Sequence, residues 1–251
     1  MTTPPIDQGT AYTEGAPPEK SSIFEDFIDV FYTPSTVYAR RQNSSVWPYF
    51  LIIAVLAAVL TLASQSVYSA AIDGDFTRRM TKVMAENPQL TEEMVSRQRG
   101  FSEKFGMVAM YLAMPFTILL VGILTWIAAK LVSAKLDFGR AMLVTTLAQI
   151  PRLLGALLTA IYAVLVSDTS SIDSVSKLTW SPARFMDPDT ANPAVIGLLS
   201  RVDIFTIWVT ILIGIGVAVV GKVARSRGYT AAAIVWGVPT VIALVGAILA
   251  G

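Results

Sequence analysis

The chain has 251 residues and a formal net charge of +1; it is 54% hydrophobic but only 15% charged, whereas a soluble domain carries about 25% charged residues. This composition excludes an ordinary soluble domain and, without a basic tract, a nucleic-acid partner. The absence of cysteine and histidine excludes thiol chemistry and removes the commonest general base and metal ligand.

The N-terminal region divides into a tail and a helical part. Residues 1–20 are rich in Thr, Pro, Gly and Glu with little to bury, which predicts a disordered tail. Residues 21–46 are predicted to form cytoplasmic amphipathic helices, the first of which begins with a capping box of Ser22 and Glu25. Its apolar side chains recur at helical spacing, with Asp26 on an acidic opposite face: Ile23, Phe24, Phe27, Ile28 and Phe31. This helix either lies against the bilayer surface or the bundle, or docks a partner protein.

Five apolar segments predict an all-α membrane domain over residues 47–251. Each is close to the roughly 20 residues that a bilayer core requires. The spans are expected at about residues 47–67, 106–130, 141–166, 204–221 and 231–250. Residues 69–104 are polar, with helical apolar spacing on either side of Pro88, and predict a helical loop outside the hydrocarbon. Small residues four apart, such as Gly214 and Ala218, favour close helix packing, with a second copy of the chain as one candidate partner.

The third span contains three residues that are costly in hydrocarbon. Pro151 removes a backbone donor, and Arg152 carries a permanent charge that costs at least ~2.5 kcal/mol at mid-bilayer. Arg152 either reaches water, pairs inside the bundle with a carbonyl or with Gln149, or lines a substrate path. We expect Asp203 to lie more than ~10 Å from it along the bilayer normal. Alternatively, the helix restarts at Pro151, which would leave Arg152 near water.

The Lys and Arg residues in the loops predict how the chain is oriented in the membrane. Nine Lys and Arg residues lie on the N-terminal side and in the two short turns, and nine lie in the two long loops. The residues in the short turns are dense and close to the span ends, where the positive-inside rule is strongest. The sequence therefore predicts a cytoplasmic N-terminus and an extracytoplasmic C-terminus.

One motif has the pattern of a known catalytic site. Residues 92–97 have the E-E-x-x-x-R pattern of intramembrane proteases of the CAAX-processing type. Those enzymes also use histidines, which this chain lacks, and the motif lies in a polar loop. No phosphate-binding loop, nucleophile elbow or metal-ligand cluster occurs in the sequence. We therefore expect no catalytic residue, no cofactor and no metal, and the protein is not expected to be an enzyme.

Three short motifs carry a family resemblance. Residues 201–216, RVDIFTIWVTILIGIG, contain an acidic residue, then F-x-x-W entering a span, then Leu and Gly. The matching positions are Asp203, Phe205, Trp208, Leu212 and Gly216. Residues 148–154, AQIPRLL, carry an I-P-x-L-L pattern, and Phe31 and Pro34 precede the first span. In order and spacing these motifs resemble the YIP family, polytopic proteins first named for interacting with Ypt/Rab GTPases, over about residues 22–250.

The resemblance implies five spans, a cytoplasmic N-terminus and no catalytic activity. The composition indicates a prokaryotic member of this family, which we expect in the bacterial cytoplasmic membrane. Partners implied for such proteins, besides the lipid bilayer, are another membrane protein such as an ATP-driven exporter, or a small GTPase. Our hypothesis is a non-enzymatic membrane adaptor or scaffold, with partner-binding or structural candidates at Phe24, Asp26, Phe27, Asp203, Phe205 and Trp208. The alternative is a transporter or channel subunit with a polar cavity around Gln149, Pro151 and Arg152.

Overall fold

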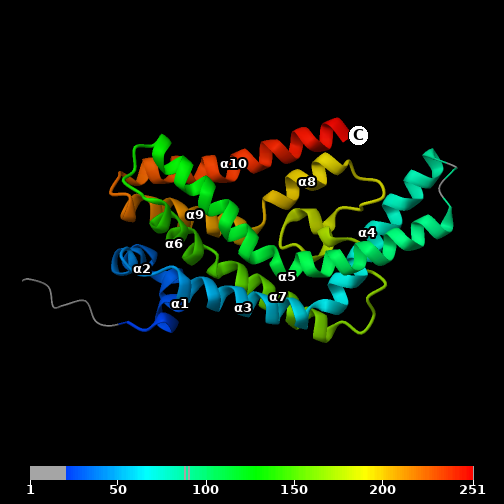
Figure 1. Cartoon of the computed structure of the whole chain (residues 1–251), viewed down its shortest axis with the longest axis horizontal. Helices are drawn as coiled ribbons and strands as arrows, with labels where there is room; N and C mark the ends of the chain where they lie inside the picture. The colour runs from blue at the N-terminus through cyan, green and yellow to red at the C-terminus, as the bar shows by residue number, and fades with distance from the viewer. Residues whose placement is uncertain (1–20, 88, 90, 251) are drawn as a thin grey trace, which may run out of the picture.

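The computed structural model describes residues 21–87, 89 and 91–250, so the tail predicted for residues 1–20 lies outside the described residues. Within those ranges the chain is helical and contains no strand, which confirms the predicted all-α class (Figure 1). The helices are α1 Ile23–Tyr32, α2 Pro34–Arg41, α3 Trp47–Ala63, α4 Gln65–Glu86, α5 Glu92–Leu131, α6 Phe138–Ala148, α7 Ile150–Leu165, α8 Pro193–Arg201, α9 Ile204–Val220 and α10 Arg225–Ala250, with short 3-10 helices η1 Val175–Leu178 and η2 Pro182–Phe185.

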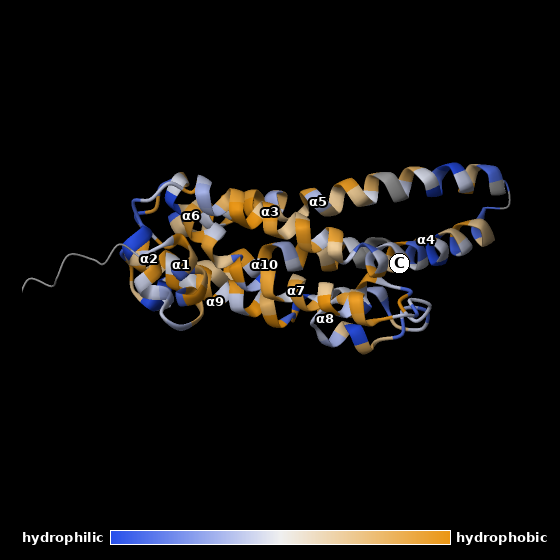
Figure 2. Cartoon of the chain, turned by 90° about the horizontal axis from the view of Figure 1, so that it is seen from below, coloured by the Kyte–Doolittle hydropathy of each residue, from blue (hydrophilic) through white to orange (hydrophobic). Residues whose placement is uncertain are grey.

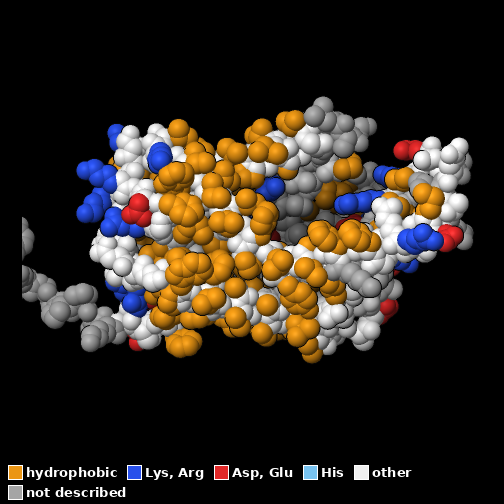
Figure 3. All heavy atoms as spheres, in the orientation of Figure 1, with side chains coloured by type: hydrophobic (Ala, Val, Ile, Leu, Met, Phe, Trp, Pro, Cys, Tyr) orange, Lys and Arg blue, Asp and Glu red, His pale blue; other side chains and the backbone are white. Residues whose placement is uncertain are grey.

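The surface of the molecule is banded along its long axis. Hydrophobic residues occupy the middle of the bundle, and hydrophilic residues gather at its two ends (Figure 2). In the space-filling view, Lys and Arg cluster at the end that carries α1 and α2, and charges of both signs gather at the end that carries the far part of α4 (Figure 3). An apolar belt between two polar ends is the arrangement that a bilayer-spanning bundle requires.

Three helices are long and apolar enough to cross a membrane within the described residues: Glu93–Leu131, Phe138–Leu165 and Arg225–Gly246. Two pairs of consecutive helices, each bent at a short break, give at most two further spans. The axes of α3 and α4 meet at 73°, and those of α8 and α9 meet at 49°. The described chain therefore has three to five candidate spans, and each of the five predicted segments falls on one of them.

The helix boundaries differ from the expected ones in two places. The second part of the predicted loop 69–104 shares one helix with the predicted second span, because α5 runs for 40 residues without a break. Its Pro115 lies inside the helix. The third predicted span is instead broken at Gln149, which ends α6 and begins α7. Pro151 then lies in the first turn of α7, where a missing backbone N–H costs no helical hydrogen bond.

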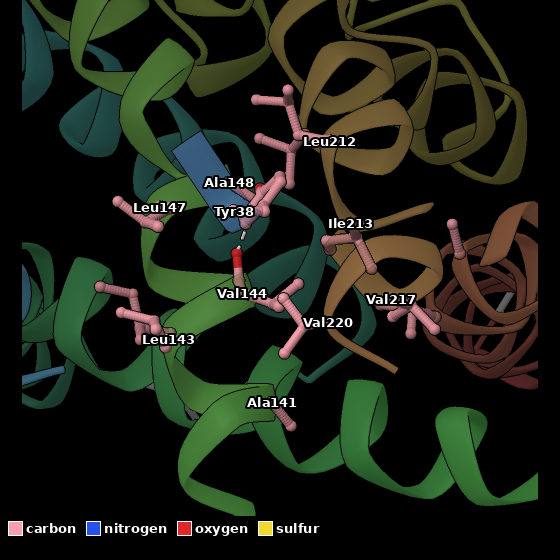
Figure 4. Packing of buried hydrophobic residues seen from close by; sticks show 14 of the residues in the cluster. Tyr38, Ala141, Leu143, Val144, Leu147, Ala148, Leu212, Ile213, Val217 and Val220 are labelled. Carbon is pink, nitrogen blue, oxygen red and sulfur yellow. Dashed lines mark hydrogen bonds between the residues drawn. The ribbon is translucent and has the colours of Figure 1, made fainter. Parts of the chain in front are cut away.

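The core is built where α2 enters the bundle between α6 and α9. Tyr38 of α2 is 1% exposed, and its hydroxyl donates to the carbonyl oxygen of Val144 at 3.4 Å (Figure 4). Burial raises the pKa of the Tyr38 phenol, so it remains a neutral donor. Gly216 of α9 faces this ring; an added Cβ would lie 3.0 Å from it and 2.5 Å from Val144. The absence of a side chain at Gly216 therefore lets α2 and α6 approach α9.

Hydrogen bonds bring the N-terminal part and both short turns to one end of the bundle. Lys135 donates its N–H to the carbonyl oxygen of Gly221 at 2.9 Å, which joins the turn after α5 to the turn after α9. Arg140 at the start of α6 donates to Asn43 at 3.1 Å. The segments expected to share the cytoplasmic side thus share one end, which we call the clamp end.

Candidate functional site

The carboxylate of Asp26 is fully buried at the clamp end, where three side chains bind it. Arg40 Nη2 lies 2.5 Å from Oδ1. Arg41 Nε donates to Oδ2 at 2.7 Å, and the Tyr49 hydroxyl donates to the same oxygen at 2.5 Å. We call these four residues the Asp26 clamp. It ties α1 to α2 and to the first turn of α3.

The charges of the clamp explain how an acidic residue faces inward. A carboxylate removed from water is tolerated only when it is paired and hydrogen-bonded. Burial by itself lowers the pKa of Arg40, but hydrogen bonds and charge interactions with Asp29 and Asp26 outweigh this effect and raise that pKa. Arg40 therefore stays charged, and with Arg41 it supplies the positive charge that Asp26 needs.

The clamp sets which face of α1 is outside. The inner face packs on the core through Ile23, Phe27, Val30 and Phe31. The outer face carries three apolar side chains four residues apart: Phe24 is 75% exposed, Ile28 63% and Tyr32 81%. We call these three residues the outer stripe. Helix α1 thus carries an exposed apolar stripe next to the side that packs on the core.

This arrangement corrects the predicted faces of α1. The expectation that Asp26 belongs to an exposed acidic face is wrong, because its side chain is fully buried. Phe24 and Phe27 were expected on one face, but Phe24 points outward while Phe27 packs on the core. Pairing of Asp26 with the two arginines rotates the helix so that the carboxylate faces inward.

At the start of α9, Asp203 is the N-cap, which is a structural role. Its Oδ1 accepts from the N–H groups of Phe205 and Thr206 at 2.9 and 3.1 Å, and its Oδ2 accepts from the N–H of Trp180 at 2.9 Å. Asp203 thereby fixes the loop before α8 against the beginning of α9. Phe205 meets the Trp180 ring edge-to-face, with centroids 6.4 Å apart.

Trp208 connects α9 to the N-terminal helix. Its ring packs edge-to-face on Phe31 of α1 at 5.0 Å between centroids. Both rings border an apolar groove of about 620 Å³ between α1, α3, α7 and α9. Phe205 and Trp208 are therefore brought to two different places, one beside Trp180 and one under α1.

Arg152 and Asp203 line one polar cavity of about 290 Å³, together with Thr159, Trp180 and Thr206. Arg152 of α7 and Asp203 at the start of α9 therefore border one opening, without an ion pair between them within 4.0 Å. Arg152 Nη2 donates to the Thr206 hydroxyl at a long 3.4 Å. Arg152 Nε is buried without a hydrogen-bond partner in the described part of the chain.

Pairing of the Gln149 side chain with Arg152, one of the alternatives for this arginine, does not form. Gln149 is fully buried, and neither its amide nitrogen nor its amide oxygen has a partner among residues 21–87, 89 and 91–250. An unpaired amide in the core costs about 1–3 kcal/mol. Gln149 is therefore energetically costly at its place in the middle of the bundle, as the sequence predicts.

Sequence reasoning missed the residues that complete these sites. Arg40, Arg41 and Tyr49 were not singled out, although two consecutive arginines follow an acidic helix in the sequence. A second missed cluster lies at the other end, where Arg78 of α4 binds Asp75 at 2.9 Å and Asp189 at 2.6 Å. Its pairing with Asp189 spans 111 residues, so no local pattern could reveal it.

The described residues contain no group of three or more acidic side chains placed to hold a metal ion. The geometry offers charge pairing, an exposed apolar stripe and a polar cavity. A banded bundle of this kind defines a multi-helix integral membrane protein.

Comparison with known proteins identifies the family. The Yip1 domain family matches residues 28–248, so the chain belongs to the Yip1 family. It is also 24% identical to the membrane protein YknW of Bacillus subtilis (strain 168) over 236 residues, which cover 92% of this chain and 91% of YknW. No solved structure matches the chain. The YIP resemblance in the motifs is thus confirmed, and the Yip1 family is not a known enzyme family.

Proposed function

We propose that this protein is a non-enzymatic membrane adaptor whose outer stripe on α1 binds a partner protein. The observation that carries the proposal is the exposure of Phe24, Ile28 and Tyr32 on a helix whose other face is already packed. Apolar side chains that meet at helical spacing are the anchors of helix-mediated recognition. Aromatic residues are also enriched at binding hot spots.

The Asp26 clamp supports this role because it holds the stripe in place before a partner arrives. Binding costs less when the recognition element is already ordered. Two guanidinium groups and one tyrosine hydroxyl bind the Asp26 carboxylate, and together they fix both the position and the rotation of α1. A helix lying loosely on the bilayer would not need such a fixed rotation.

The partner that family resemblance suggests is another membrane protein, such as an ATP-driven exporter, or a small GTPase. We place the clamp end in the cytoplasm of a bacterial cell, with the opposite end outside the cytoplasmic membrane. Asp203 and Trp208 act in this proposal as structural residues: one fixes α9, and the other supports α1 from below. A second copy of the chain is a further possible partner.

The test is affinity purification from native membranes in mild detergent. The double variant Phe24→Asp, Ile28→Asp should lose a stoichiometric partner that the wild type retains. Phe185→Asp is the matched control, because Phe185 is 85% exposed and lies on η2, in the loop before α8. Unchanged partner recovery by the double variant, or equal loss with Phe185→Asp, would contradict the proposal.

A transporter or channel subunit is the second candidate, favoured by the cavity beside Arg152. Uptake or conductance in liposomes should then be measurable and should vanish in Arg152→Leu. Identical behaviour of wild type and variant would rule this candidate out.

A further inference from the structure

The cavity of about 290 Å³ between α7, α9 and the loop that carries Trp180 contains a positive charge without a matching partner. Arg152 forms no ion pair within 4.0 Å in the part of the chain that the structure describes. Its Nε is buried and makes no hydrogen bond there. A guanidinium in such a position is unfavourable unless an anion compensates it.

Asp203 compensates this charge only in part: its carboxylate attracts the Arg152 guanidinium through space but accepts no hydrogen bond from it. Both of its carboxylate oxygens are occupied by the backbone N–H groups of Trp180, Phe205 and Thr206. Two more arginines lie close by: Arg184 stacks over the Trp180 ring at 5.1 Å, and Arg201 follows the cavity-lining Ser200. Positive charge therefore exceeds negative charge around this opening.

The remaining walls suit an oxyanion. Four hydroxyl groups line the cavity, and those of Thr159, Thr179 and Ser200 donate to backbone carbonyl oxygens. The Thr206 hydroxyl accepts from Arg152 and keeps its own proton for an oxyanion. The terminal nitrogens of the Arg152 guanidinium can donate to phosphate oxygens, which gives strong charge-assisted bonds. Trp180 and Tyr68 at the rim are aromatic residues of the kind that lie at lipid-headgroup level.

We propose that this cavity binds a phosphate group through Arg152. The group belongs either to an anionic phospholipid or to free phosphate. The helices that carry Arg152 and Asp203 also expose apolar side chains on which acyl chains can lie, among them Leu157, Ile161, Ile204 and Ile207. The site does not depend on the adaptor role of α1.

The experiment uses full-length protein in detergent, with two probes titrated separately: phosphatidylglycerol, compared with phosphatidylcholine, and inorganic phosphate. Binding is followed by native mass spectrometry and by tryptophan fluorescence. Arg152→Gln should weaken binding of the active probe by about tenfold or more, where tenfold corresponds to about 1.4 kcal/mol for the lost charge-assisted contact. Arg152→Lys should recover part of it, because the charge returns without the planar fork.

Two further variants guard against misfolding and unspecific lipid association. Ala156→Phe should block the cavity while leaving all charges in place, and Arg225→Gln at the clamp end should leave binding unchanged. Dependence of phosphatidylglycerol binding on both Arg152 and Ala156 identifies a lipid site, and the same dependence for inorganic phosphate identifies a free-phosphate site. Binding of both probes that is insensitive to Ala156→Phe and to Arg152→Gln, or no binding of either probe, would overturn the proposal.

Discussion

At the scale of single residues, the most consequential side chain is Asp26, because it determines the rotation of α1. Its carboxylate is fully buried, while Arg40 and Arg41 are 17% and 20% exposed. The pair is thus closer to a buried ion pair than to a surface salt bridge. Removing one partner of such a pair leaves an uncompensated charge, which is strongly destabilising.

We therefore expect Asp26→Ala to lower the free energy of unfolding by about 2–3 kcal/mol, below the full buried-pair value because the arginines retain some solvent. Thermal unfolding in detergent measures the effect. Asp29→Ala is the matched control: its side chain is 37% exposed and, among the described residues, is bound by Arg40 alone, so about 1 kcal/mol or less is expected. Equal losses in the two variants would show that the Asp26 clamp does not stabilise the fold.

At the scale of helices, α7 and α9 approach closely because Gly155 faces the ring of Phe205. A Cβ added at Gly155 would lie 2.7 Å from two atoms of that ring. This contact positions the beginning of α9, and with it Asp203 and the polar cavity. Gly155 thus controls the site through packing and not through its own chemistry.

Gly155→Leu should destabilise the protein by about 1–3 kcal/mol, the usual effect of overpacking. The double variant Gly155→Leu, Phe205→Ala should recover part of that loss relative to Phe205→Ala alone, because the space of the ring becomes free. Gly237→Leu is the control, since no atom lies within 4 Å of a Cβ there. Additive losses in the double variant would argue against direct contact between residues 155 and 205.

The helices also show which features a sequence can predict. The capping box of Ser22 and Glu25 and the cap at Asp203 follow from local spacing, and both are present. The faces of α1 could not be predicted in the same way, because Asp26 is bound by residues 14 to 23 positions away. The cavity at Arg152 depends on contacts with residues about 50 positions further along, which no local pattern encodes.

At the scale of the whole molecule, helix α5 is long enough to have both a membrane part and a part that projects beyond the membrane. Helix α5 has 40 residues and is therefore about 60 Å long, whereas a hydrocarbon core is about 30 Å thick. Its first half runs beside α4 away from the apolar belt (Figure 2). Apolar periodicity alone predicts the span but not the continuation of one rigid helix beyond it.

The orientation can be tested with single cysteine variants, because the chain contains no cysteine. Ser45 is exposed at the clamp end, and Ser170 is exposed in the loop after α7. A membrane-impermeant maleimide applied to intact cells should label Ser170→Cys but label Ser45→Cys only after lysis. The opposite pattern would place the clamp end outside the cell and contradict the orientation that we propose.

The central claim is that the outer stripe contacts a protein and not only lipid. Site-specific photocrosslinking in living cells tests it most directly, with the photoreactive residue at position 28 and a control at position 185. We expect a discrete protein adduct from position 28 that is absent from position 185 and is lost when Asp26→Ala releases the clamp. Lipid adducts alone at position 28 would show that the stripe faces the bilayer, and would contradict the adaptor function.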